Sequence, residues 1–144
     1  MRQTLALTAL LLTTLQAHAA DPAGRWITAS GNLEVEIAPC AAAWCGTVTR
    51  VIANRSMSRE GEAMQPADTR PALGLQLLSG FVPSEHGADG PLQWTGDIYN
   101  RENAKTYRCT LALDANGALV VRPYIGLPLF GKTQVWTRAP TPQP

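Results

Sequence analysis

The feature that most constrains this chain is a series of short strand-like runs separated by turn residues. The clearest run is residues 33–37, in which apolar and charged side chains alternate over five positions. A period of two places Leu33, Val35 and Ile37 on one buried face of a β-strand and the two glutamates on the other. No segment shows a sustained period of 3.6 residues, so little helix is expected.

Seven further runs have the composition of strands, and Gly, Pro, Asn, Asp and Ser cluster between them. These expected strands are residues 24–28, 44–53, 73–81, 92–99, 105–113, 118–124 and 132–138. Asn116-Gly117 predicts a hairpin turn, because both residues tolerate positive φ. About eight strands at short, even spacing predict an all-β domain. Meander connections favour a single up-and-down antiparallel barrel, because closure leaves no free edges.

Two segments interrupt this regular pattern. Residues 54–71 are polar and charged and include two prolines. We expect a long loop or a frayed hairpin there, and long loops in compact domains are often mobile lids. Residues 125–130, Ile-Gly-Leu-Pro-Leu-Phe, form an apolar hairpin tip. This tip is expected either to rim a portal or contact a partner, or to fold back and plug the barrel end.

The amino terminus has the features of a cleavable secretory signal peptide over residues 1–19. Arg2 precedes a short apolar run, and Ala17 and Ala19 stand at positions −3 and −1 of the expected cleavage site. The apolar run is shorter than the ~20 residues of helix that span a bilayer, so an uncleaved anchor is the weaker alternative. We therefore expect a protein of the periplasm or one that is secreted.

Cleavage after Ala19 leaves 125 residues, enough for one domain with a real core. We expect the barrel domain over residues 20–138 and a disordered Pro-rich tail over 139–144. No second apolar segment is long enough for a membrane helix, so no stable membrane insertion is expected after cleavage. The mature chain carries 11 basic and 11 acidic side chains, since Arg2 is the only charge removed. This balance argues against nucleic acid or an anionic membrane as the partner.

Three cysteines remain in the mature chain, Cys40, Cys45 and Cys109. In an exported protein the default for two of them is a disulfide. Cys40 and Cys45 enclose four residues between strand-like runs and would staple a hairpin. The alternative is a metal or redox pair, but the spacing is not C-x-x-C and His86 is the only mature histidine. Cys109 would share a strand face with Leu111, as a buried, unreactive thiol.

The sequence contains no recognisable catalytic constellation. His86 stands alone in a Gly-rich turn, and there is no nucleophile–base motif, phosphate-cradling glycine loop or metal-spaced histidine cluster. Asp97, Lys105 and Tyr107 are candidate acid–base groups on adjacent strands. A surface Asp97–Lys105 ion pair beside a turn is the favoured interpretation. We therefore expect no enzyme, no cofactor and no metal.

The two ends of the domain carry a matching pair of aromatic and cationic residues. Gly24-Arg25-Trp26 opens the first expected strand, and Arg138 closes the last. These strands are neighbours in an up-and-down barrel, so the Arg138 guanidinium is expected over the Trp26 indole, a contact of ~0.5–2 kcal/mol. The alternative is an ordinary buried tryptophan and a solvated arginine. Gly-x-Trp with a terminal arginine resembles the signature of the lipocalins and their calycin relatives.

A more specific resemblance covers about 115 residues. Its motifs are Gly24-Arg25-Trp26, Val35 to Cys40, Trp44-Cys45-Gly46, Gly74 to Phe81, Gly96 to Tyr99, Lys105-Thr106-Tyr107 and Tyr124 to Arg138. In this order they are similar to a family of exported bacterial proteins catalogued as a domain of unknown function, DUF2147. The resemblance implies a lipocalin-like barrel in the periplasm or secreted from a Gram-negative bacterium, with Cys40 paired to Cys45. It implies no established activity. The chain departs from the family pattern at Asn100, where Asp is common, and at Ala104, where Gly is common.

A barrel of eight strands is wide enough for side chains and one small apolar ligand. The residues expected to face inward and line such a site are Val35, Leu75, Leu77, Phe81, Trp94, Ile98, Tyr107 and Trp136. The first hypothesis is an exported lipocalin-like protein that binds a small hydrophobic molecule. The alternative is a cell-envelope interaction protein with a filled barrel, whose contact surface is the loop at 54–71 or the hairpin at 125–130.

Overall fold

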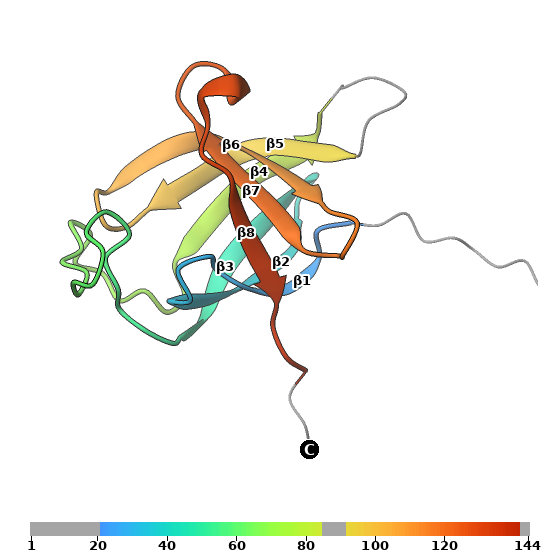
Figure 1. Ribbon diagram of the computed structural model, residues 1–144. Helices are drawn as coiled ribbons and strands as arrows, with labels where there is room; N and C mark the ends of the chain where they lie inside the picture. Colours follow the sequence, from blue (N-terminus) through green and yellow to red (C-terminus); the bar gives the residue numbers. More distant parts are fainter. Residues whose placement is uncertain (1–20, 85–91, 142–144) are drawn as a thin grey trace, which may run out of the picture.

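Eight antiparallel strands, in chain order, form the wall of a closed barrel (Figure 1). The computed structural model describes residues 21–84 and 92–141. The strands are β1 Gly24–Ile27, β2 Leu33–Cys40, β3 Ala43–Val51, β4 Gln76–Pro83, β5 Gln93–Asn100, β6 Lys105–Leu113, β7 Leu119–Tyr124 and β8 Gln134–Arg138. A short 3-10 helix, η1 Pro128–Phe130, lies between β7 and β8. The predicted all-β, up-and-down barrel is confirmed.

Some of the predictions fall outside the described residues. These are the signal peptide at 1–19, the turn that contains His86, and residues 142–144 of the tail. Among the residues that are described, no helix is long and apolar enough to cross a membrane.

Strand alternation decides which side chains fill the barrel. On β2, Leu33, Val35 and Ile37 are all buried, as their spacing predicts. The side chains with no exposed surface are Trp26, Val35, Leu78, Phe81, Cys109, Leu111, Leu119 and Val121. Leu92 begins the strand predicted over residues 92–99, but it precedes β5 and is half exposed.

The barrel closes where β1 meets β8. Trp26 and Arg138 are directly paired in this ladder, and the Arg138 guanidinium carbon lies 4.0 Å from the Trp26 ring centroid. Arg138 Nη1 also donates to the Ala23 carbonyl at 2.8 Å, and Trp26 Nε1 donates to the Pro22 carbonyl at 2.9 Å. Gly24 has φ +126° and leaves the space that the guanidinium occupies, since a Cβ there would collide with Arg138 Nη1.

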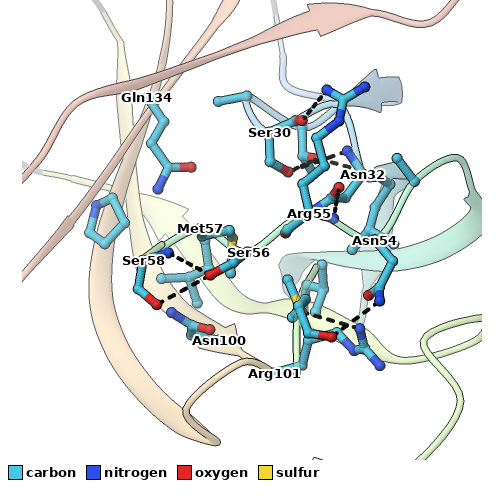
Figure 2. A pocket seen from close by; sticks show the side chains of 18 of the residues that line it. Ser30, Asn32, Asn54, Arg55, Ser56, Met57, Ser58, Asn100, Arg101 and Gln134 are labelled. Carbon is cyan, nitrogen blue, oxygen red and sulfur yellow. Dashed lines mark hydrogen bonds between the residues drawn. The ribbon is translucent and has the colours of Figure 1, made fainter. Parts of the chain in front are cut away.

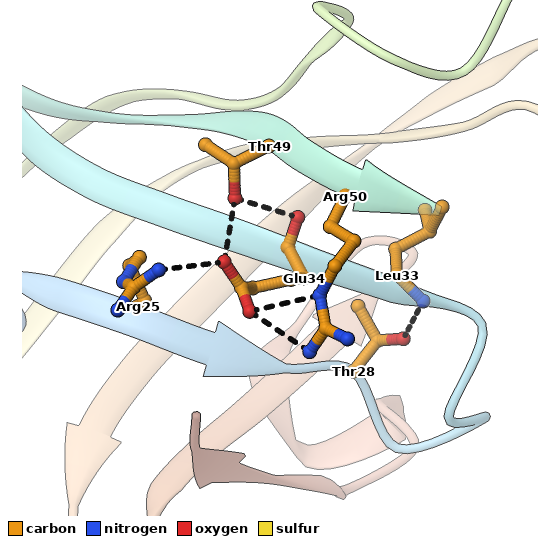
Figure 3. Close-up of polar contacts among 6 residues, drawn as sticks. All are labelled: Arg25, Thr28, Leu33, Glu34, Thr49 and Arg50. Carbon is orange, nitrogen blue, oxygen red and sulfur yellow. Dashed lines mark hydrogen bonds and ion pairs between the residues drawn. The ribbon is translucent and has the colours of Figure 1, made fainter. Parts of the chain in front are cut away.

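Glu34 is buried although the alternation of β2 places it on the face opposite Val35 (Figure 3). Its carboxylate accepts hydrogen bonds from Thr49 Oγ1 at 3.0 Å and Arg50 Nη2 at 3.1 Å, and Arg25 Nη1 lies 3.4 Å away. Desolvation by itself would raise the pKa of Glu34. The hydrogen bonds from Thr49 and Arg50 and the charges of both arginines outweigh it and hold this pKa below its usual value. The cluster ties β1, β2 and β3 together on the outside of the barrel.

The three cysteines of the chain, one pair and one free thiol, are arranged as predicted. Cys40 and Cys45 form a disulfide across the β2–β3 hairpin, with their Cα atoms 5.5 Å apart. Cys109 is free and has no exposed surface. Desolvation in the core raises the pKa of the Cys109 thiol to about 12.

The predicted ion pair between Asp97 and Lys105 is wrong. Asp97 instead accepts from Arg108 Nη1 at 2.9 Å. The reason is strand register: Asp97 stands directly opposite Arg108 in the β5–β6 ladder, whereas Lys105 stands opposite Asn100. The pair lies on the outer surface, which agrees with its predicted structural role.

The turn between β6 and β7 also differs from the expected one. Gly117 has a positive φ of 78°, but Asn116 does not. Instead the Asp114 carboxylate accepts hydrogen bonds from the backbone N–H groups of Asn116 and Ala118, both at 2.9 Å. A side chain therefore closes the turn with one left-handed residue, where the Asn-Gly pattern had predicted two.

Truncation at the barrel closure is predicted to destabilise the fold. We expect Trp26→Ala to lower the free energy of unfolding by about 3–5 kcal/mol through lost burial. Arg138→Ala should cost roughly 1 kcal/mol, because it removes the stacking contact and one hydrogen bond. Urea denaturation measures both, with the exposed neighbour Thr137→Ala as the control. Unchanged stability in both variants would contradict a stabilising role for the closure.

Acid titration tests the Glu34 cluster. The folded pKa of Glu34 lies below its usual value of 4.5, so the stability it contributes is present above that value and is lost as the pH falls through the folded pKa. Glu34→Gln should cost about 2 kcal/mol at pH 7 and should flatten the loss of stability below the usual pKa. Glu36→Gln, an exposed change on the same strand, is the matched control. Parallel stability–pH curves for the two variants would refute the account.

Thiol labelling tests the burial of Cys109. With a pKa of about 12, the thiol is almost fully protonated at pH 8, and it is also shielded from reagents. We expect iodoacetamide at pH 8 to label no thiol in the folded protein and one thiol in denaturant, as read by intact mass. Rapid labelling of the folded protein would show that this part of the core opens readily.

Candidate functional site

A cavity of about 570 Å³ lies at one end of the barrel. Three connections surround it: the β1–β2 turn at 28–32, the β3–β4 loop at 52–75 and the start of the β5–β6 turn at 100–101. Pro123 of β7 and Gln134 of β8 complete its border. The cavity opens to solvent at the barrel mouth, whereas the barrel behind it is filled with side chains of the core.

The inner wall of the cavity is apolar because it is the end of the hydrophobic core. Leu33, Leu77, Ile98 and Trp136 are core residues that line it, and Tyr107 packs against the same cluster. Strand geometry explains their convergence, since each side chain points to the inside of the barrel from a different strand or strand start.

The outer wall is polar and comes mostly from connections (Figure 2). Its polar residues include Ser30, Asn32, Asn54, Arg55, Ser56, Ser58, Asn100, Arg101 and Gln134. In Figure 2 the Gln134 side chain lies on one side of the pocket, and Ser30 and Arg55 lie on the other. A ligand that fills this space would thus have an apolar part against the core and a polar part at the rim.

Asn32 attaches the β3–β4 loop to the β1–β2 turn. Its side chain is almost fully buried, donates to the Arg55 carbonyl at 2.8 Å and accepts from the Arg55 N–H at 2.9 Å. The Asn32 carbonyl accepts from the N–H groups of Ile52 and Ala53. Four hydrogen bonds to one residue fix where the loop leaves β3, and so fix one side of the cavity.

Glu102 attaches the same loop to the β5–β6 turn. Its carboxylate accepts from the hydroxyls of Ser56 and Ser58 and from the Met57 N–H. Desolvation alone would raise the pKa of Glu102, but these bonds and the nearby charge of Arg59 hold it below its usual value. Two residues near the β5–β6 turn depart from the family pattern. Asn100 Oδ1 accepts a hydrogen bond from the Glu102 N–H at 2.9 Å, and Ala104 has a left-handed φ of 57°.

A third attachment lies farther along the loop. The Asp68 carboxylate is buried and accepts from the Arg70 side chain and, at 2.6 Å, from the Tyr99 hydroxyl of β5. The hydrogen bonds from Arg70, which have the largest effect, and from Tyr99 hold the pKa of Asp68 well below its usual range. The hydrogen bond to Asp68 raises the pKa of Tyr99. The predicted long loop is confirmed. It has one isolated β-bridge, Arg55 to Ala63, and it is attached at several points.

Two arginines of the outer wall have no carboxylate partner among the described residues. Arg55 donates from its side chain only to the Ser30 carbonyl, at 3.4 Å. Arg101 donates to the Met64 sulfur at 3.5 Å, and its buried Nε has no partner within the described chain. Glu60 is the one acidic residue lining the cavity. The rim therefore presents more positive than negative charge to a ligand.

The described residues that line the cavity carry apolar, hydroxyl, amide and guanidinium groups and one carboxylate. Neither histidine nor cysteine is among them, and the described residues hold no group of three side chains suited to a metal ion. Ser56 does donate to Glu102, but a carboxylate with a lowered pKa and three donors is a weak general base. The arrangement offers shape, apolar surface and hydrogen bonds.

Only some of the residues that the sequence predicts to face inward line the cavity. Leu77, Ile98, Tyr107 and Trp136 line the cavity. The other four, Val35, Leu75, Phe81 and Trp94, pack in or against the core and do not line it. Strand periodicity finds residues that point inward, but it does not show at which height the barrel stops being filled. The polar rim was missed altogether, because it is built from turns and a loop whose partners lie 23 to 46 residues apart.

Comparison with known proteins places this fold. A solved structure described as "Protein HP1028 from the human pathogen Helicobacter pylori belongs to the lipocalin family" superposes with a TM-score of 0.58 at 17% sequence identity and covers 85% of each chain. No curated protein matches the chain. Residues 24–138 match the model of DUF2147, described as an uncharacterised protein conserved in bacteria. This chain therefore belongs to the DUF2147 family and has a lipocalin-like β-barrel.

Proposed function

We propose that this protein is an exported, non-enzymatic carrier that binds a small hydrophobic molecule in the cavity at the barrel mouth. The observation that carries the proposal is the cavity of about 570 Å³, whose inner wall is formed by residues of the hydrophobic core and whose rim is polar. Small-molecule sites typically measure about 300–1,000 Å³ and combine apolar walls with a few polar groups. The bound molecule would be amphipathic, with its apolar part against Leu77, Ile98 and Trp136.

Export is the second part of the proposal. It is supported by the signal-like residues 1–19, by the Cys40–Cys45 disulfide and by a bacterial family. A disulfide persists in the periplasm or outside the cell and is rare in a reducing cytosol. Carriage also suits that location, because apolar molecules need a binding protein to cross an aqueous compartment.

The alternative function is an interaction protein with no ligand. The filled barrel behind the cavity favours it, since Trp26, Phe81 and Trp94 are buried in the core there. The cavity favours the carrier, because a barrel that only supports loops has no need for an apolar recess beneath them. The two functions differ in one observable, which is saturable binding of an apolar probe at the mouth.

Fluorescence titration with 1-anilinonaphthalene-8-sulfonate tests the carrier function. We expect saturable binding to the parent protein. Ile98→Phe adds a ring to the inner wall of the cavity and should weaken binding about tenfold or more. Val51→Phe, at a half-exposed position of β3 that does not line the cavity, is the matched control and should bind like the parent.

Thermal melting of both variants checks that the fold is intact. If the folded parent binds no apolar probe, the carrier function is overturned. If the parent binds and Ile98→Phe binds equally well, binding occurs elsewhere and the assignment of the site is overturned.

A further inference from the structure

The connection between β7 and β8 carries a tip of exposed apolar side chains, residues 125–130, which we call the apolar tip. Ile125, Leu127, Leu129 and Phe130 are each 60–78% exposed. In Figure 1 this connection, with η1, projects from the barrel at the top of the view. The alternative that the segment folds back and plugs the barrel end is wrong, because these side chains contact solvent.

The exposed conformation is held by specific hydrogen bonds. Arg122 of β7 donates through Nε to the Pro128 carbonyl at 2.7 Å and through Nη2 to the Leu129 carbonyl at 3.1 Å. Its Nη1 donates to the Thr133 hydroxyl. Gly131 lies close to both Arg122 and Pro123. A Cβ at this position would collide with the Pro123 carbonyl oxygen and with the Arg122 side chain. One side chain thus braces the connection from within and presents the apolar tip outward.

The described barrel wall leaves most of the apolar surface of the tip uncovered. A groove of about 540 Å³ separates Pro128 and Leu129 from the strands beneath. The other residues that line it are Ser84, Gln93, Thr95, Thr110, Arg122 and Tyr124. The described residues therefore leave four large apolar side chains exposed on a braced, outward-facing tip, which is typical of an interaction site.

Among the described residues, the charged ones that flank the apolar tip along the chain are basic. No acidic residue occurs after Asp114, while Arg122 and Lys132 flank the tip on its two sides. On the outer surface, the Asp97 carboxylate of β5 is paired with Arg108. The equal numbers of acidic and basic residues in the mature chain conceal this uneven distribution, and for that reason the argument from net charge against an anionic membrane does not apply to this end of the chain.

We propose that the apolar tip docks the barrel reversibly on the surface of a phospholipid bilayer that contains anionic lipid. Ile125, Leu127, Leu129 and Phe130 enter the boundary between headgroups and acyl chains, and Lys132 lies at the level of the phosphates. A small projecting tip of this kind suits a fluid surface, which closes around it, better than the broad face needed for a protein interface. The docking does not require a ligand in the cavity.

The position of the apolar tip gives the docking a consequence for the barrel mouth. Pro123, just before the tip, and Gln134, just after it, both line the cavity. A bilayer that holds the tip therefore lies beside the cavity entrance. An amphipathic molecule would have a short path between the two.

Vesicle co-sedimentation tests the docking. The protein is recovered after export, its amino terminus is read by intact mass, and it is mixed with phosphatidylcholine vesicles with or without phosphatidylglycerol. We expect the parent to bind, more tightly with phosphatidylglycerol. The double variant Leu129→Ser/Phe130→Ser should lower the partition coefficient at least about tenfold. Lys132→Gln should lower it about fivefold on the anionic vesicles alone.

Leu73→Ser is the matched control, because Leu73 is equally exposed but lies in the β3–β4 loop. It should partition like the parent, and thermal melting should show all variants folded. Equal partition of the parent and the double variant would overturn the proposal. So would a parent that dimerises through the tip, or that pulls down one protein through it, while ignoring vesicles.

Discussion

The structure depends on a short ladder between its first and last strands. Only Trp26 with Arg138 and Ile27 with Thr137 are paired between β1 and β8, yet these contacts turn an open sheet into a barrel. The stacked guanidinium and the buried indole reinforce the ladder where it has few backbone bonds. The cavity depends on it directly, because Trp136 of β8 and Leu33, at the start of β2, form parts of one wall. An open sheet would place them apart.

The closed barrel supplies the inner wall of the cavity, and polar anchors hold the loop that supplies much of the outer wall. Asn32, Glu102 and Asp68 each bind the long β3–β4 loop to a different part of the mouth. Asn32 and Asp68 are buried and Glu102 is partly buried. Burying a polar group is costly unless its hydrogen bonds are made, so each anchor allows few alternative loop positions. The rim is therefore shaped in advance of any ligand. The conformation of the apolar tip is likewise fixed by hydrogen bonds, because Arg122 donates to the backbone of the tip.

Sequence periodicity was enough to predict the barrel, because side-chain direction in a strand depends only on neighbours in the chain. Leu33, Val35 and Ile37 show this, and the Cys40–Cys45 disulfide was predicted from a short spacing.

Contacts between residues far apart in the sequence could not be predicted. Glu34 has the pattern of an exposed residue and is buried by Arg25 and Arg50 of the two flanking strands. Asp97 selects Arg108 through register, and Asp68 meets Tyr99 across 31 residues of sequence. Half of the proposed ligand-contacting side chains do not line the cavity, because their place in the barrel depends on packing that no local pattern records.

Native mass spectrometry of the protein tests the central claim, that the barrel mouth is a binding site. The protein would be recovered gently from the expressing cells and measured before and after unfolding. The account predicts an added lipid-sized mass on the folded parent that is lost on unfolding and is reduced or absent in Ile98→Phe. Repeated recovery of the bare chain, including after incubation with lipid mixtures, would contradict it.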